Sequence, residues 1–140
     1  MIDQLLPVVA RGFLSAIFIH AGINHCFKFA GMQQTITDKG FPPALATAMA
    51  IGAIVLLLGG GFSVLLGFKT RWGAIALILF LIPATLMFHL NFSDPMEPIQ
   101  FLKNVGLIGG LLLLAQTGSG RYSFDNWQIR RSYGNGKLDS

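Results

Sequence analysis

Long apolar runs alternate with short polar segments along the chain. The runs cover about residues 5–27, 43–68, 72–92 and 99–116. Each is close to the ~20 residues that a helix needs to cross ~30 Å of hydrocarbon. Their apolar residues occur all round a helical projection rather than on one stripe, which argues against a water-soluble bundle. The pattern predicts an all-α polytopic membrane protein, with a four-transmembrane-helix bundle over residues 1–120.

A short amphipathic segment separates the first two runs. Phe29, Met32 and Ile36 recur at helical spacing, with Gln and Thr residues between them. Gly40 and the two prolines that follow Phe41 are signals that end a helix. We therefore predict a short interfacial helix between the first two spans.

The few charged residues lie mainly between the runs and at their ends, and they predict an orientation. Charged residues make up 11% of the chain, against about 25% in soluble domains. Four spans place both termini on one side, with seven basic residues: Arg11, Lys69, Arg71, Arg121, Arg130, Arg131 and Lys137. The other side has three: Lys28, Lys39 and Lys103. The positive-inside rule then predicts cytoplasmic termini and a basic cytoplasmic tail over residues 121–140.

Small residues predict where the spans meet their neighbours. In lipid, close backbone approach by small residues brings helices together, because the hydrophobic effect no longer drives association. The packing candidates are Gly12, Gly52, Gly60, Gly106 and Gly110. These glycines either pack the spans of this chain against one another, or they contact partner subunits or a second copy of the chain.

Polar side chains gather where spans one and three end and span four begins. Ionisable groups in a membrane are costly, so they are candidates for function. The candidates at this outer end are His20, Asn24, His25, His89, Lys103 and Asn104. They form a ligand or quinone site, or they are ordinary interface polarity. Metal or haem is not expected, because no HExxH, paired CxxC or tight ligand spacing occurs.

Arg11 lies inside the first span, about two turns from its start. Helical spacing places it on one face with Gly22 and His25, opposite His20 and Asn24. One interpretation is a site for an anion, a lipid headgroup or a quinone oxygen. The other is an arginine that reaches the interface or bonds a nearby helix end.

Several short motifs occur in the order known from one family. They are Gly40-Phe-Pro-Pro, Gly60-Gly61, Gly67-Phe-Lys-Thr-Arg71, Gly118-Ser-Gly120 and Ser123-Phe-Asp125. Together they resemble the DoxX family of small bacterial and archaeal membrane proteins. The resemblance implies a four-helix bundle in a prokaryotic plasma (inner) membrane. Members often carry a glutamate shortly before the paired glycines, where this chain has Leu57, which argues against chemistry that depends on that carboxylate.

Three functions follow from these observations. The resemblance links relatives to a thiosulfate:quinone oxidoreductase, as a small subunit, and to complexes that handle oxidative or thiol stress. The favoured function is a non-catalytic accessory or anchoring subunit of a membrane redox complex, since the chain lacks ligands for an electron-carrying cofactor. The alternatives are a quinone-interacting subunit and a small carrier or lipid-binding protein. Membrane lipids are expected partners, and nucleic acid is not, because the net charge of +4 gathers at span ends and in the tail.

Overall fold

The computed structural model describes residues 1–135, and within them every regular element is a helix. The helices are α1 (Ile2–Phe27), α2 (Phe29–Asp38), α3 (Pro43–Leu66), α4 (Thr70–Phe88), α5 (Glu97–Thr117) and α6 (Phe124–Asn135). Among these residues four helices, α1, α3, α4 and α5, are long and apolar enough to cross a membrane. The predicted all-α fold with four spans is confirmed.

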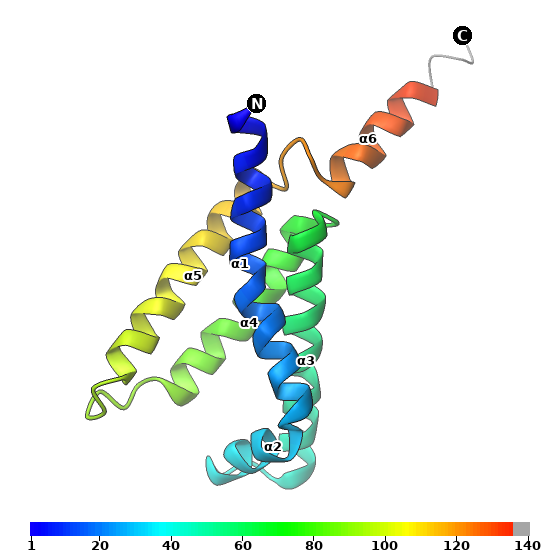
Figure 1. Ribbon diagram of the computed structural model, residues 1–140. Coiled ribbons are helices and arrows are strands. Elements are labelled where there is room, and N and C mark those ends of the chain that lie inside the picture. The colour runs from blue at the N-terminus through cyan, green and yellow to red at the C-terminus, as the bar shows by residue number, and fades with distance from the viewer. Residues whose placement is uncertain (136–140) are drawn as a thin grey trace.

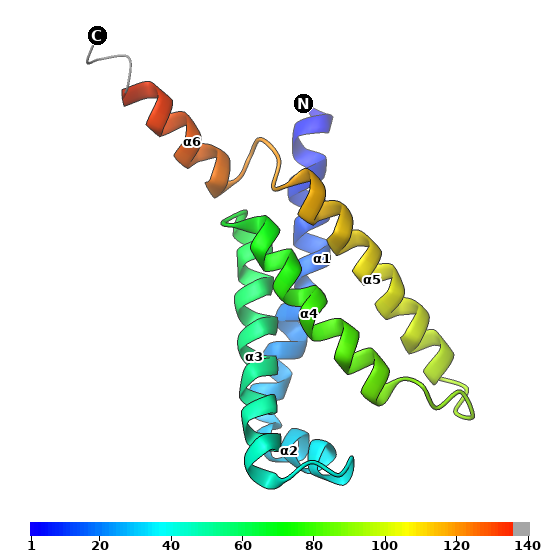
Figure 2. The same cartoon turned by 180° about the vertical axis from the view of Figure 1, so that it is seen from behind.

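The four long helices pack in the order α1, α3, α4, α5, each mainly against the next. Figure 1 shows both termini at one end of the molecule, called here the terminal end. Helix α2 and the connection between α4 and α5 lie at the opposite end, called here the far end. Figure 2 shows from behind that α5 lies along α4, on the side away from α3.

Glycines permit the closest approach between α3 and α4. A Cβ added at Gly60 would lie 2.7 Å from Leu77 Cγ and 3.0 Å from the carbonyl oxygen of Gly73. Both distances are too short for a real side chain to be accommodated without movement. The buried core continues from this crossing: Phe18, Leu57, Val64, Ala74, Leu77, Leu81 and Leu111.

Helix α2 folds back against the start of α3. Ile36 is buried against Ala46 and Ala50, and Phe29 and Met32 pack beside them. The helical spacing of the three apolar residues of α2 therefore corresponds to a real packed face, which confirms the short helix between the first two spans. Gly40, at a φ of +96°, then turns the chain toward α3.

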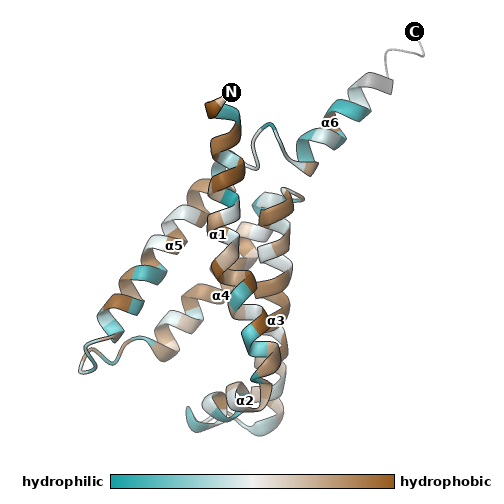
Figure 3. Cartoon of the chain, viewed as in Figure 1, coloured by the Kyte–Doolittle hydropathy of each residue, from teal (hydrophilic) through white to brown (hydrophobic). Residues whose placement is uncertain are grey.

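The outer faces of the long helices are covered by large apolar side chains. Phe13 is 79% exposed, and Leu79 and Leu102 are each more than 60% exposed. Figure 3 shows hydrophobic colour along much of the long helices and polar colour on α6. Exposed apolar surface of this extent is typical of helices that face lipid.

The helices do not share all bounds with the apolar runs. Helix α4 ends at Phe88, although the run continues to residue 92. The predicted tail includes a further helix, α6, which the polarity of residues 121–135 did not indicate. Lys137 and the rest of residues 136–140 lie outside the described part of the chain.

Candidate functional site

A cavity of about 610 Å³ opens in the far half of the molecule, between α1, α2, α4 and α5. We call it the lateral cavity. Its walls are mainly apolar, with Phe18, Ala21, Leu57 and Phe80 among the lining residues. Its volume lies within the ~300–1,000 Å³ common for small-molecule sites.

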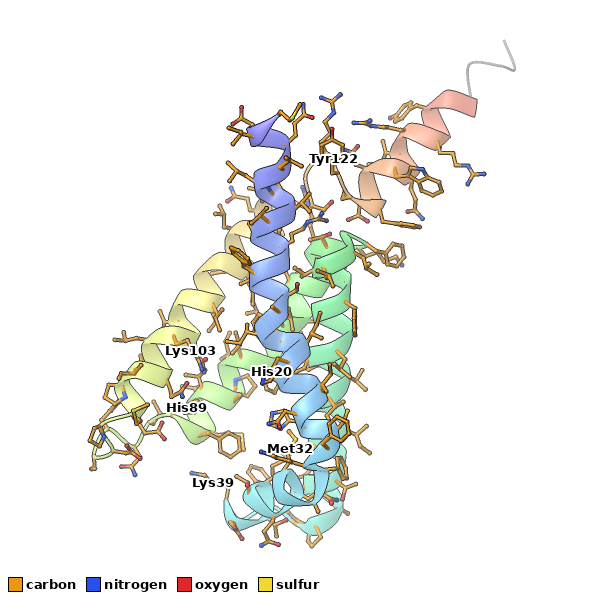
Figure 4. The ribbon with its side chains drawn as sticks, viewed as in Figure 1. His20, Met32, Lys39, His89, Lys103 and Tyr122 are labelled. Carbon is orange, nitrogen blue, oxygen red and sulfur yellow. The ribbon has the colours of Figure 1, made fainter. Side chains whose placement is uncertain are left out.

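Five of the candidate residues line this cavity. They are Asn24, His25, His89, Lys103 and Asn104. Lys28, at the end of α1, joins them. Figure 4 shows His89 and Lys103 in the far half, with Met32 of α2 below them. Three sequence segments therefore bring hydrogen-bonding and cationic groups to one otherwise apolar cavity.

His89 is oriented by an acidic residue at the start of α5. Its Nδ1 lies 2.9 Å from Glu97 Oε2. A carboxylate only accepts hydrogen bonds, so Nδ1 carries the proton of this bond, and Nε2 remains for a further partner. The pair also links the end of α4 to the start of α5, where the helix stops at residue 88 rather than following the apolar run.

Asn104 is anchored in the cavity wall. It is buried, and its Nδ2 donates a 2.9 Å hydrogen bond to Thr85 Oγ1. Thr85 in turn donates to the Leu81 carbonyl. The amide therefore ties α5 to α4. Lys103 beside it is exposed, and within residues 1–135 its side chain hydrogen-bonds only the Gln100 side chain of its own helix.

Two candidates lie elsewhere. His20 is exposed on α1 and does not line the cavity, although helical spacing groups it with Asn24. Arg11 is near the terminal end, far along α1 from His25. Within residues 1–135, no three His, Cys, Asp or Glu side chains are placed so that they could hold a metal ion.

Arg11 is almost fully buried, with 3% of its surface exposed. Its Nη2 donates a 2.7 Å hydrogen bond to the Tyr122 carbonyl, and Nε donates to Pro7 of its own helix. Nη1 has no hydrogen-bond partner in the described chain and packs against Gly67. A side chain at Gly67, whose φ is +69°, would occupy the space of this guanidinium.

Asp125 completes this cluster from the other side. Its carboxylate accepts hydrogen bonds from the amides of Lys69 and Thr70 at 2.6 and 3.1 Å, and from the hydroxyls of Thr70 and Ser119. Its own amide donates to the Gly67 carbonyl. The first amides of a helix lack partners within it, so Asp125 caps α4 from a remote position in the sequence.

The ionisation of Asp125 follows from these contacts. Partial burial opposes the charged form, but the bonds from Lys69, Thr70 and Ser119 outweigh it and lower the pKa of Asp125. Hydrogen bonds to a carboxylate favour its charged form. The negative charge also lies close enough to Arg11 to attract it.

Sequence reasoning did not identify this cluster of Arg11, Gly67, Thr70, Ser119 and Asp125 as a unit. Arg11 lies in span one, whereas Gly67, Thr70, Ser119 and Asp125 belong to separate motifs that follow spans two and four. No periodicity links positions so distant along the chain, and Asp125 lies outside the apolar runs. The available signal was Asp125, one of two acidic residues in an otherwise basic tail.

The candidate packing glycines have different surroundings. Gly60 is in close contact with α4, and a Cβ at Gly110 would meet Leu14 at an ordinary 3.7 Å. Gly12, Gly52 and Gly106 have no neighbouring atom of the described chain within 4 Å of a Cβ position. The chain itself therefore uses only some of the small residues for close packing.

Comparison with known proteins agrees with this architecture. The chain matches the DoxX family model over residues 6–90 and the SURF4 family model over residues 61–131. It is 37% identical over 124 residues to inner membrane protein YqjF of Escherichia coli (strain K12), covering 89% of this chain and 92% of that protein. It is 35% identical over 127 residues to inner membrane protein YphA of the same organism, covering 86% and 89%. No solved structure matches. With its four apolar helices, the chain is an integral inner membrane protein that belongs to the DoxX family.

Proposed function

We propose that this chain binds a small amphiphilic molecule of the quinone class in the lateral cavity. The observation that carries the proposal is the convergence of five polar candidate residues on one apolar cavity of about 610 Å³. A quinone has a ring with two hydrogen-bonding oxygens and an apolar tail. The cavity combines both requirements within the membrane-spanning part of the molecule.

The polar residues supply complementary hydrogen bonds. Lys103 and Asn24 carry donors for quinone carbonyl oxygens, and neither side chain hydrogen-bonds a residue of another helix in the described chain. The Nε2 atom of His89 can accept from a quinol hydroxyl, because Nδ1 is engaged by Glu97. The site therefore has groups for both oxidation states of the ligand.

The cavity has little chemistry of its own for electron transfer. Leu57, at the position where the family resemblance implies a glutamate, forms part of the apolar wall. Electrons would come from a partner subunit, so the chain acts as a quinone-interacting subunit of a membrane redox complex. The proposed orientation has cytoplasmic termini, which puts the far end and its polar residues on the opposite side of the membrane.

A filling substitution tests the cavity directly. Ala21 lines the cavity, whereas Ala16, on the same helix, is exposed outside it. Purified full-length protein in mild detergent is titrated with decylubiquinone, and bound ligand is counted by native mass spectrometry. Ala21→Phe should weaken binding about tenfold or more, because the ring occupies ligand space. Ala16→Phe should retain binding. Equal binding by the two variants, or none by the wild type, would refute the proposal.

A second candidate is the non-catalytic accessory or anchoring subunit. It is favoured by Gly106 and Gly109 of α5, which are exposed and have nothing within 4 Å of a Cβ position. Such a face suits close helix contact with another membrane protein. Gly106→Leu should then release a co-purified partner in mild detergent, while leaving decylubiquinone binding unchanged.

A further inference from the structure

A second cavity, of about 650 Å³, lies at the terminal end, where the turn between α3 and α4 meets the segment between α5 and α6. We call it the basic cleft. Lys69, Arg71 and Arg121 line it, together with Trp72 and Asp125. The proposed quinone site does not include any of these residues.

The cleft keeps a net positive charge. Lys69, Arg71 and Arg121 have no carboxylate within 4 Å in the described chain, where the one ion pair is His89–Glu97 at the other end. Asp125 is the acidic residue in the lining, and its oxygens already accept four hydrogen bonds. Its charge is also attracted to Arg11. Three cations therefore line the cleft against one carboxylate.

Contacts within the protein hold the segment that carries Arg121. Arg11 binds the next carbonyl, that of Tyr122, at 2.7 Å. Asn126 Nδ2 donates to the Arg121 carbonyl at 3.2 Å, and Ser123 Oγ donates to the Gly120 carbonyl at 2.8 Å. The backbone under Arg121 is thus fixed before a ligand arrives, which reduces the entropy lost on binding.

The cleft lies where lipid headgroups would meet the protein. It adjoins the terminal ends of α4 and α5, which are membrane-spanning helices. Trp72 is 72% exposed, and tryptophan is enriched at the boundary between hydrocarbon and water. Arginine recognises phosphate oxygens through paired N–H donors.

We propose that the basic cleft binds a phosphate group, presented by the headgroup of an anionic phospholipid, between Lys69, Arg71 and Arg121. The guanidinium groups provide directed hydrogen bonds, and Lys69 adds a third charge. Cationic residues beside an anionic membrane surface each contribute about fivefold to binding.

The fluorescence of Trp72 can report binding in the basic cleft. In a Trp127→Phe background it is the sole tryptophan of the chain. Full-length protein in nonionic detergent is titrated with phosphatidylglycerol or phosphatidylcholine that carry identical brominated acyl chains, and quenching of Trp72 fluorescence is followed. Phosphatidylglycerol should give the same quenching as phosphatidylcholine at a mole fraction that is lower by about tenfold or more. Arg71→Gln/Arg121→Gln should remove most of this preference, and Arg121→Gln alone should reduce it about fivefold.

Arg130→Gln is the matched control, because it removes one positive charge at the same end but outside the cleft lining. It should leave the preference for phosphatidylglycerol unchanged.

Relief of quenching by sodium phosphate, but not by sodium chloride at equal ionic strength, would show that free phosphate also fits. If quenching persists in sodium phosphate, the site accepts the phosphate group only as part of a lipid headgroup. Equal quenching by both lipids, or an equal loss in Arg130→Gln and Arg121→Gln, would overturn the proposal. Helicity by circular dichroism confirms that each variant is folded.

Discussion

The two ends of the bundle use similar polar residues in opposite ways. At the terminal end, Arg11 and Asp125 bond to backbone and side chains of three different segments. At the far end, His25 and Lys28 line the lateral cavity and make no side-chain hydrogen bond in the described chain. Arg11 and Asp125 therefore stabilise the fold at the terminal end, whereas His25 and Lys28 remain available to a ligand at the far end. The difference lies in whether each side chain has a hydrogen-bond partner within the described chain.

The strongest test of this contrast removes Asp125. Asp125→Ala should lower the free energy of unfolding by about 3 kcal/mol, since the start of α4 loses its cap and buried Arg11 loses a nearby negative charge. Unfolding by sodium dodecyl sulfate in mixed micelles, followed by circular dichroism, measures this change. Asp38→Ala is the control at the far end, where the carboxylate accepts one exposed bond from Gln34. It should cost less than about 0.5 kcal/mol.

Lowering the pH should remove the stabilisation that the Asp125 cap provides, with a smaller effect than the Asp125→Ala substitution. The folded pKa of Asp125 is lowered from its ordinary 3.8, so the unfolded chain binds the proton more readily. The stabilisation is complete above the unfolded pKa and is lost as the pH falls through the folded pKa. Unfolding midpoints measured from about pH 6 to about pH 2 should therefore fall more for the wild type than for Asp125→Asn. Parallel curves would show that the carboxylate charge is not what stabilises this end.

The smallest effect is expected at the far end. Asn104 and Thr85 form its one fully buried side-chain hydrogen bond between helices in the described chain. A double-mutant cycle with Asn104→Leu and Thr85→Val should give a coupling of about 0.6 kcal/mol, the average for such bonds in membrane proteins. The same micelle unfolding assay measures it. A coupling above about 2 kcal/mol would mean that both ends are equally interlocked, and the contrast would fail.

Hydrophobic pattern was sufficient for the main helices because membrane spans are defined by length and all-round apolarity. The short helix α2 was also predictable, since Phe29, Met32 and Ile36 show their packed face directly. The residues at which helices begin and end were harder to predict from the sequence, because they depend on partners that are distant along the chain. Thr70 begins α4 under the cap supplied by Asp125, and the bond between His89 and Glu97 accompanies the early end of the same helix.

The gathering of polar residues in the far half could be anticipated in outline. Spans one and three end on the same side, so the sequence predicts His25 and His89 at the same end of the bundle, without showing whether they meet. The prediction could not separate His20 from this group, because its exposure depends on how α1 is rotated against its neighbours. Arg11 stands out in the sequence as a costly charge in a membrane span, but its partners lie across a turn and a loop that periodicity does not describe.

The remote cap also has a consequence for how the protein is made. Asp125 follows Thr70 by 55 positions, so the ribosome supplies it about 3 to 11 s after Thr70 at ordinary rates of translation. During that interval the first three spans can enter the bilayer, while the beginning of α4 has no acceptor for its amides and Arg11 has no carbonyl from residue 122. The terminal end can therefore close only after residue 125 has been synthesised. A nascent chain stalled before that point would present unpaired polar groups that quality-control proteases can recognise.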